Sequence, residues 1–291
     1  MCIRDSYDCI EAYSFNATER SNNWSCMNSS TLLSNEEKAV AVVKALITGD
    51  STILRYISDT EYIQHNLSYE DGKSGIRHLY KGSSSGITIE VHRVFSDDNI
   101  VVLHSTYGGT WNEGTPQVVF DLFRFQDGLI VEHWDNLQNI NDPAIDIING
   151  NTQVDGTIDI RAGNALENKQ LVESVIKDLY IGRKYATVNA SFHEQYIQHS
   201  IGTPNGTDWI SPFLIGLPQY ASLKYIFGAG DFVITLSETF PNDEGGEGVL
   251  AFFDLFRLEE GKVKEHWDVI QTIPPRSDWK NENGKWGLYK Q

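Results

Sequence analysis

The tetrapeptide "EHWD" occurs at residues 132–135 and again at 265–268, an offset of 133 residues. Two further matches keep nearly the same spacing, namely "YIQH" at 62–65 and 196–199, and "FDLFR" at 120–124 and 253–257. Three collinear matches at nearly constant spacing indicate a tandem duplication. A period of this length is typical of a whole domain and not of a solenoid unit.

Both copies have the same predicted order of elements. A helical pattern comes first, at 35–50 and 167–183, with apolar residues three and four apart, acids in the first turn and a glycine at the end. The "YIQH" strand follows, and we expect a further short helix at 74–80 and at 207–215. Alternating strand patterns come last, at 88–95, 100–107, 118–125, 130–137 and, ending the second copy, 263–270. Helices followed by an antiparallel meander predict an α+β fold.

Composition shifts set the expected domain boundaries. We predict an irregular segment at 1–34, a first domain at 35–140, a linker rich in Asn, Asp and Gly at 141–166, a second domain at 167–273 and a polar tail at 274–291.

The bulk composition excludes several classes of protein. The chain has 291 residues, 40% of them hydrophobic, and a formal net charge of −17, which disfavours binding to nucleic acid or to an anionic membrane. No apolar run is long enough for a transmembrane helix, and the first residues lack the pattern of a signal peptide, so we expect a cytoplasmic protein. The cysteines, Cys2, Cys9 and Cys26, all precede the repeats, so no thiolate metal site is expected inside them.

The last hairpin of each copy carries most of the polar residues of interest. A two-residue turn would require positive φ at Glu260, whereas a three-residue loop requires it only at the glycine, so we expect the longer loop. That loop pairs Asp121 with His133, and Asp254 with His266. It places Phe123 and Asp135 on the same face as the first pair, with Phe256 and Asp268 in the second copy. The expected reverse face carries Leu122, Arg124, Ile130, Glu132 and Trp134, with Leu255, Val263 and Trp267 in the second copy.

These motifs carry a family resemblance. "YIQHN", "FDLFR" and "DG" followed by "IVEHWD" resemble the SnoaL-like group of the nuclear transport factor 2-like (NTF2-like) superfamily, which includes polyketide cyclases and predicted aldol-condensation enzymes. The resemblance covers 35–140 and 167–273. It implies two cone-shaped domains, each with N-terminal helices and a curved, mainly antiparallel sheet around a pocket. It also implies acid–base chemistry without metal or cofactor on a small hydrophobic or polyketide-like substrate.

The resemblance also implies the site residues, position by position. The catalytic candidates are His65, Asp121, His133 and Asp135 in the first copy, and His199, Asp254, His266 and Asp268 in the second. The candidates for ligand contact are Tyr62, His104, Phe123, Tyr196 and Phe256. The copies differ where His104 falls opposite Ser237, so we expect the first copy to contribute most of any turnover.

Other interpretations of the same residues stay open. A carboxylate facing a histidine can orient the ring and shuttle a proton, but it can also be a buried structural pair or anchor a ligand without turnover. A dehydratase or isomerase on this fold is a further alternative. A site with two histidines and one carboxylate for a metal is disfavoured, because no short ligand spacing occurs in the repeats.

The repeated tryptophan has its own expected role. A sheet with one face toward a pocket leaves a second apolar face, which would be an aggregation hazard in water. We therefore expect the two sheets to pack against each other about a pseudo-twofold axis, with Trp134 and Trp267 near it. The chain would then be an internal pseudo-dimer and a monomer in solution.

Overall fold

The computed structural model describes residues 33–80, 86–140, 148–210, 219–240 and 248–287. Contacts group Asn35–Gln291 into one compact unit. The predicted irregular segment lies almost wholly outside the described residues, as does part of the short helix expected at 207–215. Within the described residues, no helix is long and apolar enough to cross a membrane.

The two copies, called repeat one and repeat two below, each begin with a helix and contain five strands in a matching order. Repeat one contains α1 (Asn35–Thr48), η1 (Ser51–Tyr56), β1 (Ile63–Gln64), α2 (Gly72–Ile76), η2 (Arg77–Tyr80), β2 (Ile87–Asp97), β3 (Ile100–Gly109), η3 (Trp111–Gly114), β4 (Gln117–Gln126) and β5 (Leu129–Asn139). Repeat two contains α4 (Ala165–Val175), η4 (Ile176–Ile181), η5 (Tyr185–Thr187), α5 (Val188–Ser191), β6 (Phe192–Gln198), β7 (Tyr220–Ala229), β8 (Phe232–Thr239), β9 (Leu250–Glu259) and β10 (Lys262–Thr272), with η6 (Arg276–Asp278) after it. The predicted α+β class is confirmed.

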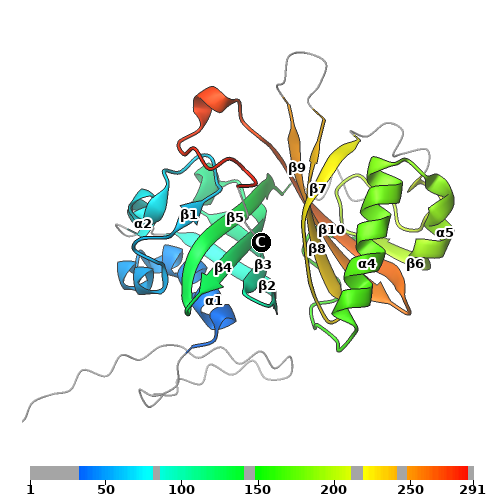
Figure 1. Ribbon diagram of the computed structural model, residues 1–291, viewed down its shortest axis with the longest axis horizontal. Coiled ribbons are helices and arrows are strands. Elements are labelled where there is room, and N and C mark those ends of the chain that lie inside the picture. The colour runs from blue at the N-terminus through cyan, green and yellow to red at the C-terminus, as the bar shows by residue number, and fades with distance from the viewer. Residues whose placement is uncertain (1–32, 81–85, 141–147, 211–218, 241–247, 288–291) are drawn as a thin grey trace, which may run out of the picture. The chain divides into compact units, whose positions relative to one another are not determined.

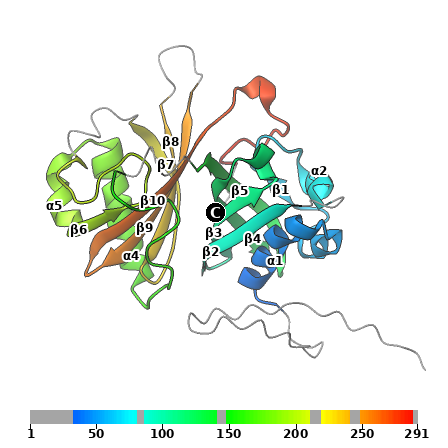
Figure 2. The same cartoon turned by 180° about the vertical axis from the view of Figure 1, so that it is seen from behind.

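The first helix of each repeat follows from its sequence pattern. In α1 the apolar spacing buries Val42, Val43 and Leu46 on one face. In α4 the side chain of Asn164 caps the helix by accepting a hydrogen bond from the backbone N–H of Glu167. Each helix covers one face of its own sheet: α1 lies on β2 and β3 (Figure 2), and α4 lies on β7 and β8 (Figure 1).

Each repeat forms one five-stranded mixed sheet. The order is β1-β5-β4-β3-β2 in repeat one and β6-β10-β9-β8-β7 in repeat two. The last four strands of each repeat are antiparallel neighbours, whereas the first strand pairs in parallel with the last. The "YIQH" segment is therefore placed directly beside the "EHWD" segment, although 67 residues separate His65 and Glu132 in the sequence.

The two faces of each sheet enter different cores. Side chains alternate along a strand, so Val119 and Phe123 of β4 pack beneath α1, while Phe120 and Leu122 point the other way. The reverse faces of both sheets share one buried cluster, to which each contributes a tryptophan, Trp134 and Trp267.

Polar contacts also join the two reverse faces. The fully buried amide of Asn136 donates hydrogen bonds to the backbone carbonyls of Ala251 and Val269, at 2.9 and 2.8 Å. The side chain of Gln138 in turn accepts one from the backbone N–H of Ile270 at 2.8 Å. These bonds connect strands from different repeats, and those of Asn136 satisfy the donors of its buried amide.

Candidate active site

The β4–β5 hairpin turns differently from the expectation. Its turn has two residues, with positive φ at both Asp127 (51°) and Gly128 (76°), and repeat two matches it at Glu260 (51°) and Gly261 (71°). The expected three-residue loop is therefore wrong. Such a turn matches the right-handed twist of the strands, and here that preference outweighs the cost of positive φ at a glutamate.

A β-bulge then shifts the register between β4 and β5. It lies between Arg124 and Phe125, and beyond it Asp121 pairs with Asp135 and Phe123 with His133. The equivalent bulge in repeat two pairs Asp254 with Asp268, and Phe256 with His266. The expected pairing of Asp121 with His133 is wrong by two residues, but an even shift leaves the predicted site residues on one face.

The bulge also moves one residue of each hairpin to the other side. Ile130 packs in the core beneath α1, and Val263 packs in the equivalent core of repeat two. Both were expected on the reverse face. Because each bulge adds one residue to the strand, the side chains between the bulge and the turn lie on the opposite face from the one that simple alternation predicts.

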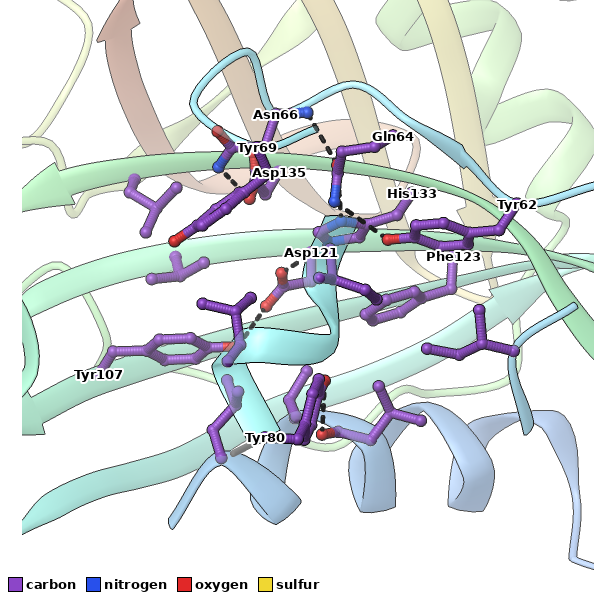
Figure 3. Close-up of a pocket in the computed structure, with 18 of the residues that line it drawn as sticks. Tyr62, Gln64, Asn66, Tyr69, Tyr80, Tyr107, Asp121, Phe123, His133 and Asp135 are labelled. Atoms are coloured by element: carbon purple, nitrogen blue, oxygen red, sulfur yellow. Dashed lines mark hydrogen bonds and ion pairs between the residues drawn. The ribbon is translucent and has the colours of Figure 1, made fainter. Parts of the chain in front are cut away.

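A cavity lies over the sheet face of repeat one that carries Asp121, His133 and Asp135, between the sheet and the helices (Figure 3). It has about 560 Å³ of empty volume, part of it open to solvent. Its polar lining includes Gln64, Asn66, Asp121, His133 and Asp135, and its aromatic lining is Tyr62, Tyr69, Tyr80, Tyr107, Trp111 and Phe123.

The contacts of His133 define its protonation. Its Nε2 lies 3.0 Å from Asp121 Oδ1, and its Nδ1 lies 3.2 Å from Gln64 Oε1. Gln64 Oε1 also accepts a hydrogen bond from the backbone N–H of Asn66 at 2.8 Å, so it is the amide oxygen that faces the ring. An oxygen cannot donate, so Nδ1 carries a hydrogen. One proton is then left to be shared between Nε2 and Asp121 Oδ1.

Asp121 is buried and held from its other side by a phenol. The hydroxyl of Tyr107 donates to Asp121 Oδ2 at 2.8 Å. Burial raises the pKa of Asp121, and the charge of Asp135 adds to this, while the hydrogen bonds from His133 and Tyr107 oppose it. Burial and the adjacent Asp121 also raise the pKa of Tyr107 well above its usual value, which keeps the phenol a donor.

Asp135 differs from Asp121 in having one oxygen free. Its Oδ2 accepts a hydrogen bond from Asn66 Nδ2 at 2.7 Å. Its Oδ1 is buried, and among the described residues it has no hydrogen-bond partner. A buried carboxylate oxygen without a partner is costly, so its presence on the cavity wall marks it as a functional candidate.

Two predicted site residues of repeat one lie outside the cavity. His65 points to the reverse face, where its ring stacks on Trp134 with centroids 4.8 Å apart and its Nε2 lies 2.8 Å from Glu132 Oε1. His104 is also buried there; its Nδ1 accepts a hydrogen bond from Arg93 at 3.0 Å, and burial followed by the Arg93 charge holds its pKa well below the usual value. The expected difference between the repeats therefore cannot rest on His104.

The residues that sequence reasoning missed are Gln64, Asn66 and Tyr107. Gln64 and Asn66 flank His65 in "YIQHN", and strand alternation puts them on the face opposite His65, with Tyr62. Alternation predicts the face on which they lie, but their place at the site depends on the parallel pairing of β1 with β5. Tyr107 had no comparable signal, because its position depends on the β3–β4 register.

Repeat two contains a matching cluster. His266 Nε2 lies 3.1 Å from Asp254 Oδ1, and His266 Nδ1 lies 2.9 Å from Gln198 Oε1. The hydroxyl of Ser200 donates to Asp268 Oδ2 at 2.8 Å, in the place of Asn66. Burial raises the pKa of Asp268 to about 6.

The cluster of repeat two also differs in its phenol. Tyr220, from β7, lies 3.2 and 3.1 Å from the two oxygens of Asp254, whereas Tyr107 comes from β3 and contacts one oxygen of its aspartate. The predicted contact residues Tyr196 and Phe256 lie in the core beneath the helices of repeat two. His199 stacks on Trp267 with centroids 4.5 Å apart, as His65 stacks on Trp134.

Both clusters offer donors of a kind that metals use. The ligand atoms of Asp121, His133 and Asp135 lie within 4.8 Å of one another, and so do those of Asp254, His266 and Asp268. Sequence spacing could not show these sets, because their members come from two neighbouring strands. Carboxylate and imidazole suit several divalent ions, so metal content needs direct measurement.

Residues 39–133 match the family model described as "SnoaL-like domain", and the predicted resemblance is confirmed for this stretch. The match covers the strands that carry Asp121 and His133. This match and the pocket support a small-molecule enzyme or a small-molecule binding protein. No curated protein matches the chain.

Solved structures of similar fold each align with somewhat over a third of the chain. They include a SnoaL-like polyketide cyclase from Agrobacterium tumefaciens (14% identity, 37% of this chain and 93% of that one, TM-score 0.31). They also include an epoxide hydrolase from M. tuberculosis (16%, 37% and 84%, 0.30) and an NTF2-like protein of unknown function from Cytophaga hutchinsonii (14%, 38% and 94%, 0.32).

Proposed function

We propose that repeat one is a small-molecule acid–base enzyme of the SnoaL-like cyclase or aldol-condensation type. The observation that carries the proposal is the free Oδ1 of Asp135 on the cavity wall, beside the Asp121–His133 pair that holds a single shared proton. One group can accept a proton and the neighbouring pair can donate one, as general acid–base catalysis requires.

The cavity wall indicates the chemical class of the substrate. Its lining is mostly aliphatic and aromatic, and none of the described lining residues is a lysine or arginine. Its ionisable groups are acidic apart from His133, so an anionic substrate would be repelled. A neutral, largely apolar compound with carbonyl groups fits this wall, and a polyketide-like molecule is of that class.

The proposed reaction has two proton transfers. Asp135 Oδ1 removes a proton from a carbon flanked by carbonyls, which gives an enolate. The enolate carbon forms a bond to a second carbonyl carbon of the same molecule, and the resulting alkoxide takes the proton shared by Asp121 and His133. The proton on Asp135 then returns to that pair through solvent, which restores the starting state.

The surrounding residues assist by position. Asn66 orients Asp135, Gln64 fixes the His133 ring, and Tyr107 holds Asp121. General acid–base steps of this kind contribute typically ~10²–10⁴-fold to the rate. Holding a flexible substrate in a folded conformation would supply the rest.

A dehydratase or isomerase would use the same first proton transfer, and a binding protein would use the same wall without turnover. The full set of hydrogen bonds on Asp121 and His133 is the observation that favours a structural or binding role. A measurement of carbon acidity separates these cases, because only an enzyme accelerates the removal of a carbon-bound proton.

Deuterium incorporation from D₂O into a panel of neutral poly-β-carbonyl compounds, followed by NMR, tests the proposal without a known natural substrate. The protein should accelerate exchange in at least one compound, and Asp135→Asn should abolish the acceleration while Asp268→Asn in repeat two keeps most of it. Exchange that survives Asp135→Asn would refute Asp135 as the base. The assay is run with and without EDTA. Loss of exchange only in the presence of EDTA would indicate that the cluster acts through a bound metal ion.

A further inference from the structure

Two segments that follow the last strand of each repeat share a short motif. We call residues 148–157 the linker arm and residues 279–287 the C-terminal arm. Each contains Asn-x-Asn, at Asn149 and Asn151 and at Asn281 and Asn283. In both arms the second backbone N–H donates to the side-chain oxygen of the first asparagine, at 2.8 and 3.1 Å. The arms thus share this turn at the Asn-x-Asn motif.

The C-terminal arm follows β10 of repeat two but binds repeat one. Asn281 Nδ2 donates to the backbone carbonyls of Asn66 and Tyr69, at 2.9 and 3.0 Å, and Asn283 Nδ2 donates to that of Gln64 at 3.0 Å. In Figures 1 and 2 the red end of the chain runs beside β1 and β5.

The linker arm follows β5 of repeat one, where Arg93 donates to its backbone carbonyls, and its asparagines bind repeat two in the same way. Asn149 Nδ2 donates to the backbone carbonyl of Thr203 at 2.7 Å, and Asn151 Nδ2 donates to that of Gln198 at 3.0 Å. Gln198 holds His266 as Gln64 holds His133. Each arm therefore binds the repeat that it does not follow in the sequence. It contacts the strand whose glutamine holds the site histidine, His133 or His266.

The histidines of "YIQH" are the second anchor of each arm. His65 Nδ1 contacts the backbone carbonyl of Gly284 at 2.7 Å, and His199 Nδ1 contacts that of Thr152 at 3.1 Å. Each arm also places a glycine in close contact with this histidine. A Cβ on Gly287 would lie 2.3 Å from the His65 ring, and one on Gly156 would lie 2.7 Å from the His199 ring. Arm binding thus explains why both copies contain this histidine outside the cavity.

The C-terminal arm also reaches the site aspartate of repeat one. The buried ammonium of Lys285 donates to the backbone carbonyl of Asp135 at 2.6 Å. The same arm therefore holds the backbone of Gln64, of Asn66 and of Asp135. Those three residues set the proton on His133 and the orientation of the free Asp135 oxygen.

We propose that the arms are exchanged between the repeats and that each arm positions the site of the repeat it crosses to. Asn281, Asn283 and Lys285 are then positioning residues for the site of repeat one, although they follow repeat two in the sequence. The catalytic meaning of this positioning rests on the proposed function, whereas the control of the site geometry does not.

Crosswise variants test the proposal in the full chain. Asn281→Ala/Asn283→Ala should shift the ring ¹⁵N resonances of His133 and leave those of His266 unchanged. The matched control, Asn149→Ala/Asn151→Ala, should do the reverse. General loss of stability would disturb both histidines together, so the crosswise pattern separates positioning from a merely structural role.

The proposal is overturned if each double variant affects the histidine of its own preceding repeat, affects both equally, or affects neither. If a double variant does not fold, the single variants Asn283→Ser and Asn151→Ser decide by the same pattern. The deuterium-exchange assay is kept separate: a crosswise NMR pattern with no exchange in the unmodified protein would refute the proposed function and leave the exchanged arms standing.

Discussion

At the scale of single residues, the site depends on one proton and one free oxygen. The sequence motifs predicted the carboxylates and the histidine that line the cavity, Asp121, His133 and Asp135. They could not assign roles among them, because the hydrogen bonds that distinguish the three come from Gln64 on β1 and from Asn66 just after it. Parallel pairing of β1 with β5 brings these amides to the site, and no local pattern in a two-residue strand reveals such pairing.

The tautomer of His133 is the first prediction at this scale. Because Gln64 Oε1 faces Nδ1 and can only accept, Nδ1 should carry the hydrogen of the neutral ring. Ring ¹⁵N NMR measures both nitrogens. Gln64→Glu gives a control in which the acceptor is retained and charged. A neutral His133 with its hydrogen on Nε2 would contradict the assignment.

The pH dependence of stability tests the buried carboxyl of repeat two. Burial raises the pKa of Asp268 to about 6 in the folded protein, above the value of ~3.9 in an unfolded chain. The folded state therefore binds this proton more tightly, and the resulting stabilisation is complete below pH ~4 and lost as the pH rises through the folded pKa.

The variant Asp268→Asn has no carboxyl to titrate at this position. Its stability therefore lacks the pH-dependent loss described for Asp268. The free energy of unfolding of the variant, minus that of the unmodified protein, should therefore increase between pH ~4 and pH ~7. Urea unfolding of both proteins at both pH values measures the difference. A difference that stays constant would show that the pKa of Asp268 is not raised on folding.

At the scale of elements, the hairpin shows what sequence rules can and cannot decide. The strands were predicted because their apolar and polar residues alternate. The turn was predicted wrongly, since Glu260 adopts the positive φ that the longer loop was chosen to avoid. The β-bulge had no signal of its own in the sequence. The site residues were still placed on the correct face, because the error in register was an even number of residues.

The two turn positions of repeat two give a paired prediction. Gly261 has a φ of 71°, and no atom would lie within 4 Å of an added Cβ, so Gly261→Ala isolates the cost of left-handed backbone. It should lower the free energy of unfolding by ~1 kcal/mol. Glu260→Asn should raise it slightly, since asparagine tolerates this conformation better. Both are read by urea unfolding, and unchanged stability in Gly261→Ala would contradict the observed turn.

At the scale of the whole molecule, duplication explains the repeated motifs. In each "EHWD" the histidine and aspartate face the site and the tryptophan enters the cluster shared by both sheets. The glutamate contacts the "YIQH" histidine, at 2.8 Å in repeat one and 3.3 Å in repeat two. The sequence predicted the repeats and their shared seam but treated the linker and the tail as accessory. Their role stayed hidden because it depends on contacts between distant residues, 215 positions apart for Asn281 and Asn66 and 54 apart for Asn149 and Thr203.

Removing one repeat should expose this seam. A fragment of residues 35–140 would leave Leu122 and Trp134 in water and would also lack the C-terminal arm. We expect it to aggregate or homodimerise, whereas the full chain should be monomeric, because large apolar patches drive association. Light scattering after size-exclusion chromatography measures both. A folded, monomeric fragment would show that the seam is not needed.

Separate removal of the two candidate dyads tests the central claim most directly. In deuterium exchange on a responsive poly-β-carbonyl compound, Asp121→Asn should lower the rate by at least ~10²-fold, because an amide keeps the shape of the carboxyl but cannot carry the shared proton. Asp254→Asn should have a much smaller effect, since Asp121 and not Asp254 lines the cavity described above. Equal losses would contradict the predominance of repeat one, and full exchange in the double variant would contradict catalysis by these dyads.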